Sequence, residues 1–137
     1  MKKDKNYDEL LQSIEKDQEE LVDLCLRLGN TSSPHGKEIK VGEAVIDWFK
    51  KNGIEAFLQF ITEESVNAVG LIPGSGDGTS LILNAHMDTG AEPGPEATEA
   101  ERRIEGAWVD GELIFGKGVI NDKAQLCAFM IAANPKI

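Results

Sequence analysis

Two residue types that often carry function in small proteins are scarce in this chain, which has two cysteines and two histidines in 137 residues. Two cysteines cannot supply the several bridges that hold small disulfide-rich secreted domains together. Cys25 and Cys127 lie in apolar stretches with helical spacing, and we expect both to be reduced residues of the core. His35 lies in a turn-forming cluster without a nearby partner, so we interpret it as a loop residue and leave His86 as the candidate for chemistry.

Long apolar runs and an excess of positive charge are also missing. No run approaches the roughly 18 residues of a membrane-spanning helix, and the first residues lack the apolar segment of a secretory signal. Acidic residues outnumber Lys and Arg by 24 to 14, which gives a formal net charge of −10. Because nucleic acids and anionic membranes are bound through Lys/Arg patches, we expect neither as a partner. These features predict one cytoplasmic globular domain.

Apolar periodicity predicts two helices in the first part of the chain. Residues 7–28 carry apolar side chains at steps of three and four, and Gly29 with Asn30 supplies a stop signal. A second helix is predicted over residues 37–51. The turn cluster TSSPHG separates the two helices. We expect the acidic face of the first helix to be solvated.

Alternating patterns then predict strands over residues 55–61 and 66–72. The Gly-rich stretch 73–79 should join the second of these to the next apolar run as a hairpin. Residues 91–106 are rich in acids and contain two prolines, so we expect a long exposed loop. Further on, the dipeptide Asp-Gly at 110–111 stands between two β-prone runs and predicts a tight hairpin.

The stretch of residues 80–90, SLILNAHMDTG, is the centre of the predicted fold. Residues 81–83 form a continuous apolar run, which is typical of a strand buried on both faces of an α/β sheet. His86 and Asp88 follow directly, at the end of a strand where open α/β sheets bind their ligands. A neutral imidazole is a good ligand for zinc-like metals, and its second N–H usually binds a carboxylate. Asp88 could be that carboxylate or a ligand itself, and a surface turn without metal is the alternative.

The last part of the chain contains a second cluster of polar residues. The turn Gly116-Lys117-Gly118 leads to Asn121 and Asp122, and residues 122–133 form an apolar pattern that predicts a helix. Asn and Asp are good N-cap residues because their side-chain oxygens accept hydrogen bonds from the first free amides. We therefore expect this pair to cap the helix.

Together, AHMDTG and the later segment GELIFGKGVINDKAQLCAFMIAA resemble the first part of the M20 metallopeptidase family. The family includes acetylornithine deacetylase, succinyl-diaminopimelate desuccinylase, aminoacylases and dinuclear zinc dipeptidases. The resemblance covers nearly the whole chain in the family's order. It implies an α/β fold, namely part of the three-layer sandwich of a zinc-exopeptidase-like catalytic domain with a mixed sheet. It also implies a zinc-dependent hydrolase that cleaves an amide bond of an N-acyl amino acid or a small peptide.

The resemblance also implies roles for individual residues. His86 would ligate one metal ion, and Asp88 would be the catalytic residue that orients it. The family's second motif, Gly-Arg-Gly-x-x-Asp-x-Lys-Gly, reads GKGVINDKA here, so the acid that bridges two metal ions falls on Asn121. Either Asn121 fills that position and binds metal weakly, or the neighbouring Asp122 takes over, because an amide is neutral and its nitrogen does not ligate while it is protonated.

Intact relatives hold two zinc ions, for which cobalt or manganese are alternatives. Residues 1–137 would correspond to the N-terminal portion of the catalytic domain, without the later strands, the downstream ligands and the lid or dimerisation domain. We therefore expect the isolated chain to be inactive, and either to self-associate as a homo-oligomer or to be only marginally stable. The competing interpretation is a truncated or degenerate relative without catalysis, which acts, if at all, through association.

Overall fold

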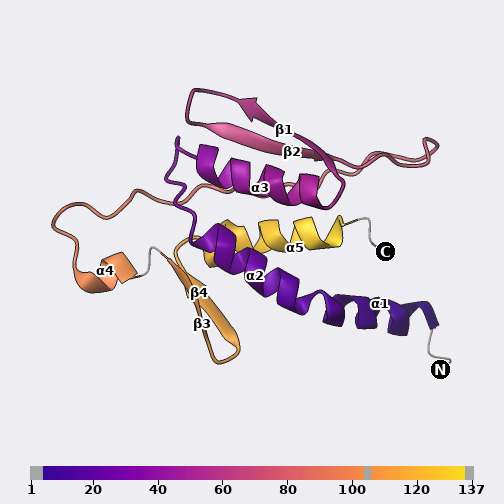
Figure 1. The fold of residues 1–137 in the computed structure, drawn as a ribbon, viewed down its shortest axis with the longest axis horizontal. Coiled ribbons are helices and arrows are strands. Elements are labelled where there is room, and N and C mark those ends of the chain that lie inside the picture. The colour runs from indigo at the N-terminus through magenta and orange to yellow at the C-terminus, as the bar shows by residue number, and fades with distance from the viewer. Residues whose placement is uncertain (1–4, 104–105, 135–137) are drawn as a thin grey trace.

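The computed structural model describes residues 5–103 and 106–134. Figure 1 shows a two-stranded sheet above helix α3, with helices α2 and α5 below it and a second hairpin beside them. The long connection between β2 and the second hairpin extends to the right of the view, returns across it at the level of α3, and carries the short helix α4 (Glu99–Arg103) on the left. The mixture of helices and two small antiparallel sheets confirms the predicted α/β class.

The first predicted helix is two helices in the structure, α1 (Lys5–Lys16) and α2 (Gln18–Gly29). They meet at Asp17, where the backbone has φ −87° and ψ −1° and the helix is interrupted. The predicted second helix is present as α3 (Ile39–Lys51). Its last turn ends at Asn52, whose backbone N–H donates to the carbonyls of Trp48 and Phe49. Apolar periodicity therefore located both helical regions correctly and missed one interruption.

Two β-hairpins form the sheets. Strand β1 (Glu55–Phe60) pairs antiparallel with β2 (Val66–Leu71), and β3 (Ala107–Asp110) pairs antiparallel with β4 (Leu113–Gly116). The Asp-Gly turn of the second hairpin was predicted correctly, and Gly111 has the positive φ of 61° that such a turn requires. Within the described ranges, no helix has both the length and the apolar character needed to cross a bilayer.

The core lies where α2, α3 and α5 (Ala124–Ala132) meet beneath the first hairpin. Its buried residues are Leu24, Cys25, Leu28, Val41, Val45, Trp48, Ile54, Cys127 and Met130. Both cysteines are buried and free, as predicted from their apolar surroundings. They also contact each other, and a hydrogen bond between the two thiols lowers the pKa of Cys25 and raises that of Cys127.

The prediction of a buried strand at residues 81–83 was wrong. Leu81 and Ile82 are 82% and 84% exposed, and this segment has no regular secondary structure and no strand pairing in the described part of the chain. The predicted hairpin through residues 73–79 is also not formed, because β2 pairs with β1. An apolar run becomes a buried strand only when other strands flank it, and both hairpins here are paired internally.

The start of the last helix also differs from the prediction. Residues 119–123 form a wide helical turn, labelled η1 (Val119–Lys123), and α5 begins only at Ala124. Asn121 and Asp122 have non-helical backbone angles within this turn, and the residue before α5 is Lys123, which makes no side-chain capping bond. The predicted N-cap was therefore wrong, because the Asn121 side chain binds a histidine instead.

Candidate functional site

His86 and Asp88 are in direct contact, as their spacing suggested. The Nδ1 of His86 lies 3.1 Å from Oδ1 of Asp88 and 3.2 Å from the Asp88 backbone oxygen. Both of these oxygens are acceptors, so Nδ1 carries a proton and donates it. This contact fixes the orientation of the ring and directs Nε2 away from Asp88, which is the arrangement found around metal-ligating histidines.

The second predicted cluster meets the first at Asn121. The Oδ1 atom of Asn121 lies 3.0 Å from Nε2 of His86, although the two residues are 35 positions apart. Asp122, the other residue predicted at this place, contributes only the attraction of its charge to His86. The peptide bond between Asn121 and Asp122 is cis. In this structure it is thus the amide of Asn121, rather than the carboxylate of Asp122, that faces His86.

The segment that carries His86 and the turn that carries Asn121 approach each other closely at Thr89 and Gly118. Gly118 has φ 75°, and a Cβ atom there would lie 2.5 Å from Cγ2 of Thr89. The neighbouring Lys117 donates from Nζ to the carbonyl of Ala91. A glycine is therefore required at 118 both for its backbone conformation and for the space it leaves. This approach sets the turn that carries Asn121 against the segment that carries His86.

Lys123 fixes the same turn from the opposite side. Its side chain is buried, and Nζ donates to the backbone oxygens of Leu28 at 2.9 Å and Thr31 at 2.8 Å. The last carbonyls of a helix have no intrahelical partner, and a cation there also complements the helix dipole. The end of α2 is thus tied to the turn that positions Asn121.

His35 is the residue of this cluster that sequence reasoning missed. Its Nδ1 lies 3.2 Å from Oδ2 of Asp88, so the carboxylate contacts two imidazoles, one at each oxygen. His35 does lie in a turn, as predicted, but Asp88 is a partner that the sequence did not reveal. The residues are 53 positions apart, and the only sequence signal was a histidine in a turn that precedes a predicted helix.

Hydrogen bonds and charges within the cluster shift the pKa values of His86 and Asp88. The hydrogen bond with Asn121 is the largest cause that raises the pKa of His86, and the charges of Asp88 and Asp122 act in the same direction. Partial burial opposes ionisation of Asp88, but its bonds to His35 and His86 and the charge of His86 hold its pKa below the ordinary value. Both nitrogens of His86 face oxygen atoms, and this geometry favours the protonated ring more than solvent alone would.

The donor set fits one part of a metal site and not a complete one. Two ligands that lie about 2.1 Å from one ion are roughly 3 to 3.5 Å apart, and Nε2 of His86 and Oδ1 of Asn121 are 3.0 Å apart. Zinc sites use three or four protein ligands, however, and an amide brings no charge. Within the described residues, no group of three or more His, Cys, Asp or Glu side chains is arranged to hold a metal ion.

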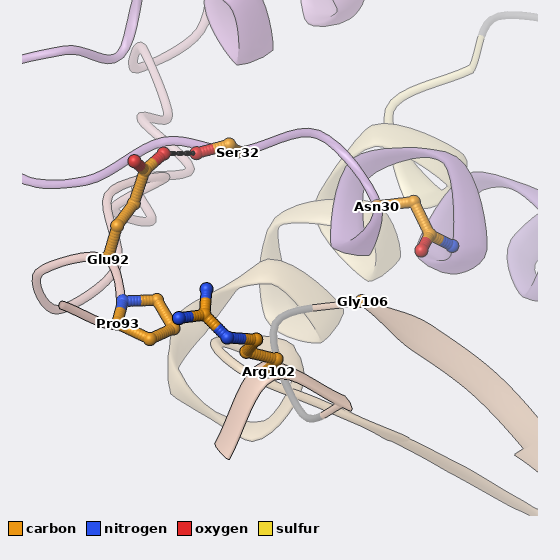
Figure 2. A pocket seen from close by; sticks show the side chains of 6 residues that line it. All are labelled: Asn30, Ser32, Glu92, Pro93, Arg102 and Gly106. Carbon is orange, nitrogen blue, oxygen red and sulfur yellow. Dashed lines mark hydrogen bonds between the residues drawn. The ribbon is translucent and has the colours of Figure 1, made fainter. Parts of the chain in front are cut away.

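A polar hollow of about 430 Å³ lies next to the loop that follows Asp88 in the chain (Figure 2). Its lining consists of Asn30, Ser32, Glu92, Pro93, Arg102 and Gly106, and includes neither His86 nor Asn121. Ser32 donates to Oε1 of Glu92 at 2.6 Å, and Arg102 donates from Nη2 to the carbonyls of Gly94 and Pro95. These bonds hold the start of the long loop in a defined shape.

Comparison with known proteins shows a similarity to part of a longer protein. No family model matches the chain. A protein of Pyrococcus furiosus that is provisionally named a LysW-lysine/LysW-ornithine hydrolase is 32% identical over 114 residues. This match covers 83% of the present chain and 30% of that protein, so the chain spans less than a third of the curated relative's length. The chain is therefore similar over most of its own length to part of a hydrolase.

Proposed function

We propose that this chain supplies the His86-bearing part of the active site of a zinc-dependent hydrolase of the M20 type. The observation that carries the proposal is the position of the His86 ring between Asp88 and Asn121, with Nδ1 bound to the carboxylate and Nε2 facing the amide oxygen. Asn121 stands where the resemblance expects the bridging acid. Similarity to a hydrolase supports the same class of activity and does not favour the non-catalytic alternative.

The substrate class that we propose is an amino acid joined through an amide bond to an acyl group or to another residue. The name of the Pyrococcus furiosus relative describes a hydrolase that acts on lysine or ornithine linked to LysW, which is compatible with this class. Asp88 is proposed to keep His86 in the tautomer whose Nε2 can ligate metal. The remaining ligands and the general base would come from outside the described residues, because these do not complete a metal site.

The proposal is tested by measuring zinc-dependent hydrolysis with the native gene product that carries this sequence. The assay uses a panel of N-acyl amino acids and dipeptides, with wild-type protein, His86→Ala and the control Lys37→Ala, which changes an exposed residue of the same turn region as His35. We expect turnover of at least one substrate in the wild type and the control, and loss of turnover in His86→Ala or after chelation. Turnover that survives both treatments would contradict the proposal.

A further inference from the structure

We propose that His35 is a positioning residue that holds the Asp88 carboxylate in the orientation in which it binds His86. Its value for catalysis rests on the function proposed above, whereas the contact itself does not. The ring of His35 meets Oδ2 of Asp88, and the ring of His86 meets Oδ1. A carboxylate bound through one oxygen can still turn about its last side-chain bond, and a second donor on the other oxygen fixes its plane.

Backbone contacts place His35 beside Asp88. The backbone N–H of His35 donates to the carbonyl of Thr89 at 3.1 Å, and the N–H of Thr89 donates to the carbonyl of Ser33 at 2.7 Å. These two bonds form a short parallel bridge in which Pro34 pairs with Thr89. The ring and the backbone of His35 therefore bind two consecutive residues, Asp88 and Thr89.

A buried serine strengthens the same bridge. Ser33 is fully buried, and its Oγ donates to the carbonyl of Met87 at 2.7 Å. The turn that carries His35 is thus fastened on both sides of Asp88, at Met87 and at Thr89. Because these bonds come from backbone and from a buried hydroxyl, the His35 ring can be changed without removing the bridge.

The side chain of His35 is much more exposed than those of Asp88 and His86. The side chain of His35 is 89% exposed, whereas those of Asp88 and His86 are 33% and 45% exposed. A ring so open to solvent adds little to the packing of the core, so removing it should leave the fold intact. Its contact with Asp88 is the interaction that His35→Ala removes.

The two histidines make a direct test by nuclear magnetic resonance possible, because the chain has only two imidazole rings to assign. The full chain, labelled with ¹⁵N and kept free of metal, gives the shift of His86 Nδ1 and the exchange rate of its proton with water. We compare wild type with His35→Ala, His35→Asn and Lys37→Ala. Asparagine places an N–H close to where Nδ1 of histidine lies, and Asp88→Asn gives the signal of a weakened acceptor.

We expect His35→Ala to raise the exchange rate of the His86 Nδ1 proton roughly three- to tenfold and to move its shift toward that of Asp88→Asn. His35→Asn should restore most of the wild-type signal, and Lys37→Ala should leave it unchanged. An unchanged signal in His35→Ala, or an equal loss in His35→Asn, would overturn the inference. Since this readout needs no hydrolysis, failure of the proposed function would not change its result.

Discussion

The ammonium group of Lys123 donates to the carbonyl of Leu28 at 2.9 Å, although the two residues are 95 positions apart in the chain. This bond joins the C-terminal end of α2 to the turn that holds Asn121 against His86. Helix packing and the candidate site therefore depend on the same buried side chain. A substitution of Lys123 should therefore also disturb the position of Asn121 beside His86.

Replacement of Lys123 tests this dependence. Lys123→Met keeps the length and apolar body of the side chain but removes its donors, and leaves the carbonyls of Leu28 and Thr31 without that partner. We expect a loss of roughly 2–4 kcal/mol in the free energy of unfolding, because a donor to buried acceptors is lost. Lys40→Met, on the exposed face of α3, is the control and should change stability by less than about 0.5 kcal/mol. Urea denaturation measures both, and equal effects in the two variants would contradict the role of Lys123.

The exposed apolar run at residues 81–83 predicts self-association. Ile82 is 84% exposed in a segment without strand pairing in the described structure, and an exposed apolar run with unpaired backbone promotes pairing between chains. We expect Ile82→Lys to reduce the associated fraction severalfold in light scattering at a fixed protein concentration. Leu113→Lys changes another exposed apolar residue, but in the paired strand β4, and should have a smaller effect. If the wild type is monomeric at that concentration, the prediction is wrong.

The raised pKa of His86 predicts the pH dependence of stability in the metal-free chain. Because its pKa in the folded state lies above the ordinary value of 6.5, the folded chain holds this proton more tightly than the unfolded chain does. The stabilisation from His86 is therefore complete below its unfolded pKa and disappears as the pH rises through the folded pKa. The melting temperature of wild type relative to His86→Ala should be higher at about pH 5.5 than at about pH 8.5. A difference that grows toward alkaline pH would have the wrong sign.

How much the sequence predicted depends on how local each feature is. The helix predicted over residues 37–51 and the hairpin around Gly111 follow from short-range patterns, and both are present, with the helix beginning at Ile39. Residues 81–83 were misjudged because burial of a strand depends on neighbours that the pattern does not reveal. The contact of His35 with Asp88 was missed because it arises from a bridge between segments more than 50 positions apart.

In the candidate site, too, the local contact could be predicted and the contacts between distant segments could not. The contact of His86 with Asp88 could be predicted from the sequence, since only one residue separates them and an imidazole that ligates metal usually binds a carboxylate through its other nitrogen. Whether Asn121 or Asp122 would face His86 could not be predicted, because it depends on the non-helical backbone angles of both residues in the turn. The position of that turn depends on Gly118 and Lys123, and both of these residues contact other segments of the chain.

Zinc titration by calorimetry tests the central claim most directly, which is that His86 and Asn121 form one part of a metal site. With wild type at about pH 8, where His86 more readily gives up its proton, we expect weak binding, because the described residues supply too few ligands for a tight site. His86→Ala should abolish this binding, Asn121→Asp should tighten it about tenfold or more by adding a charged ligand, and Asp122→Asn should change it little. Zinc binding that survives His86→Ala, or that depends on Asp122 and not on Asn121, would contradict this account of the site.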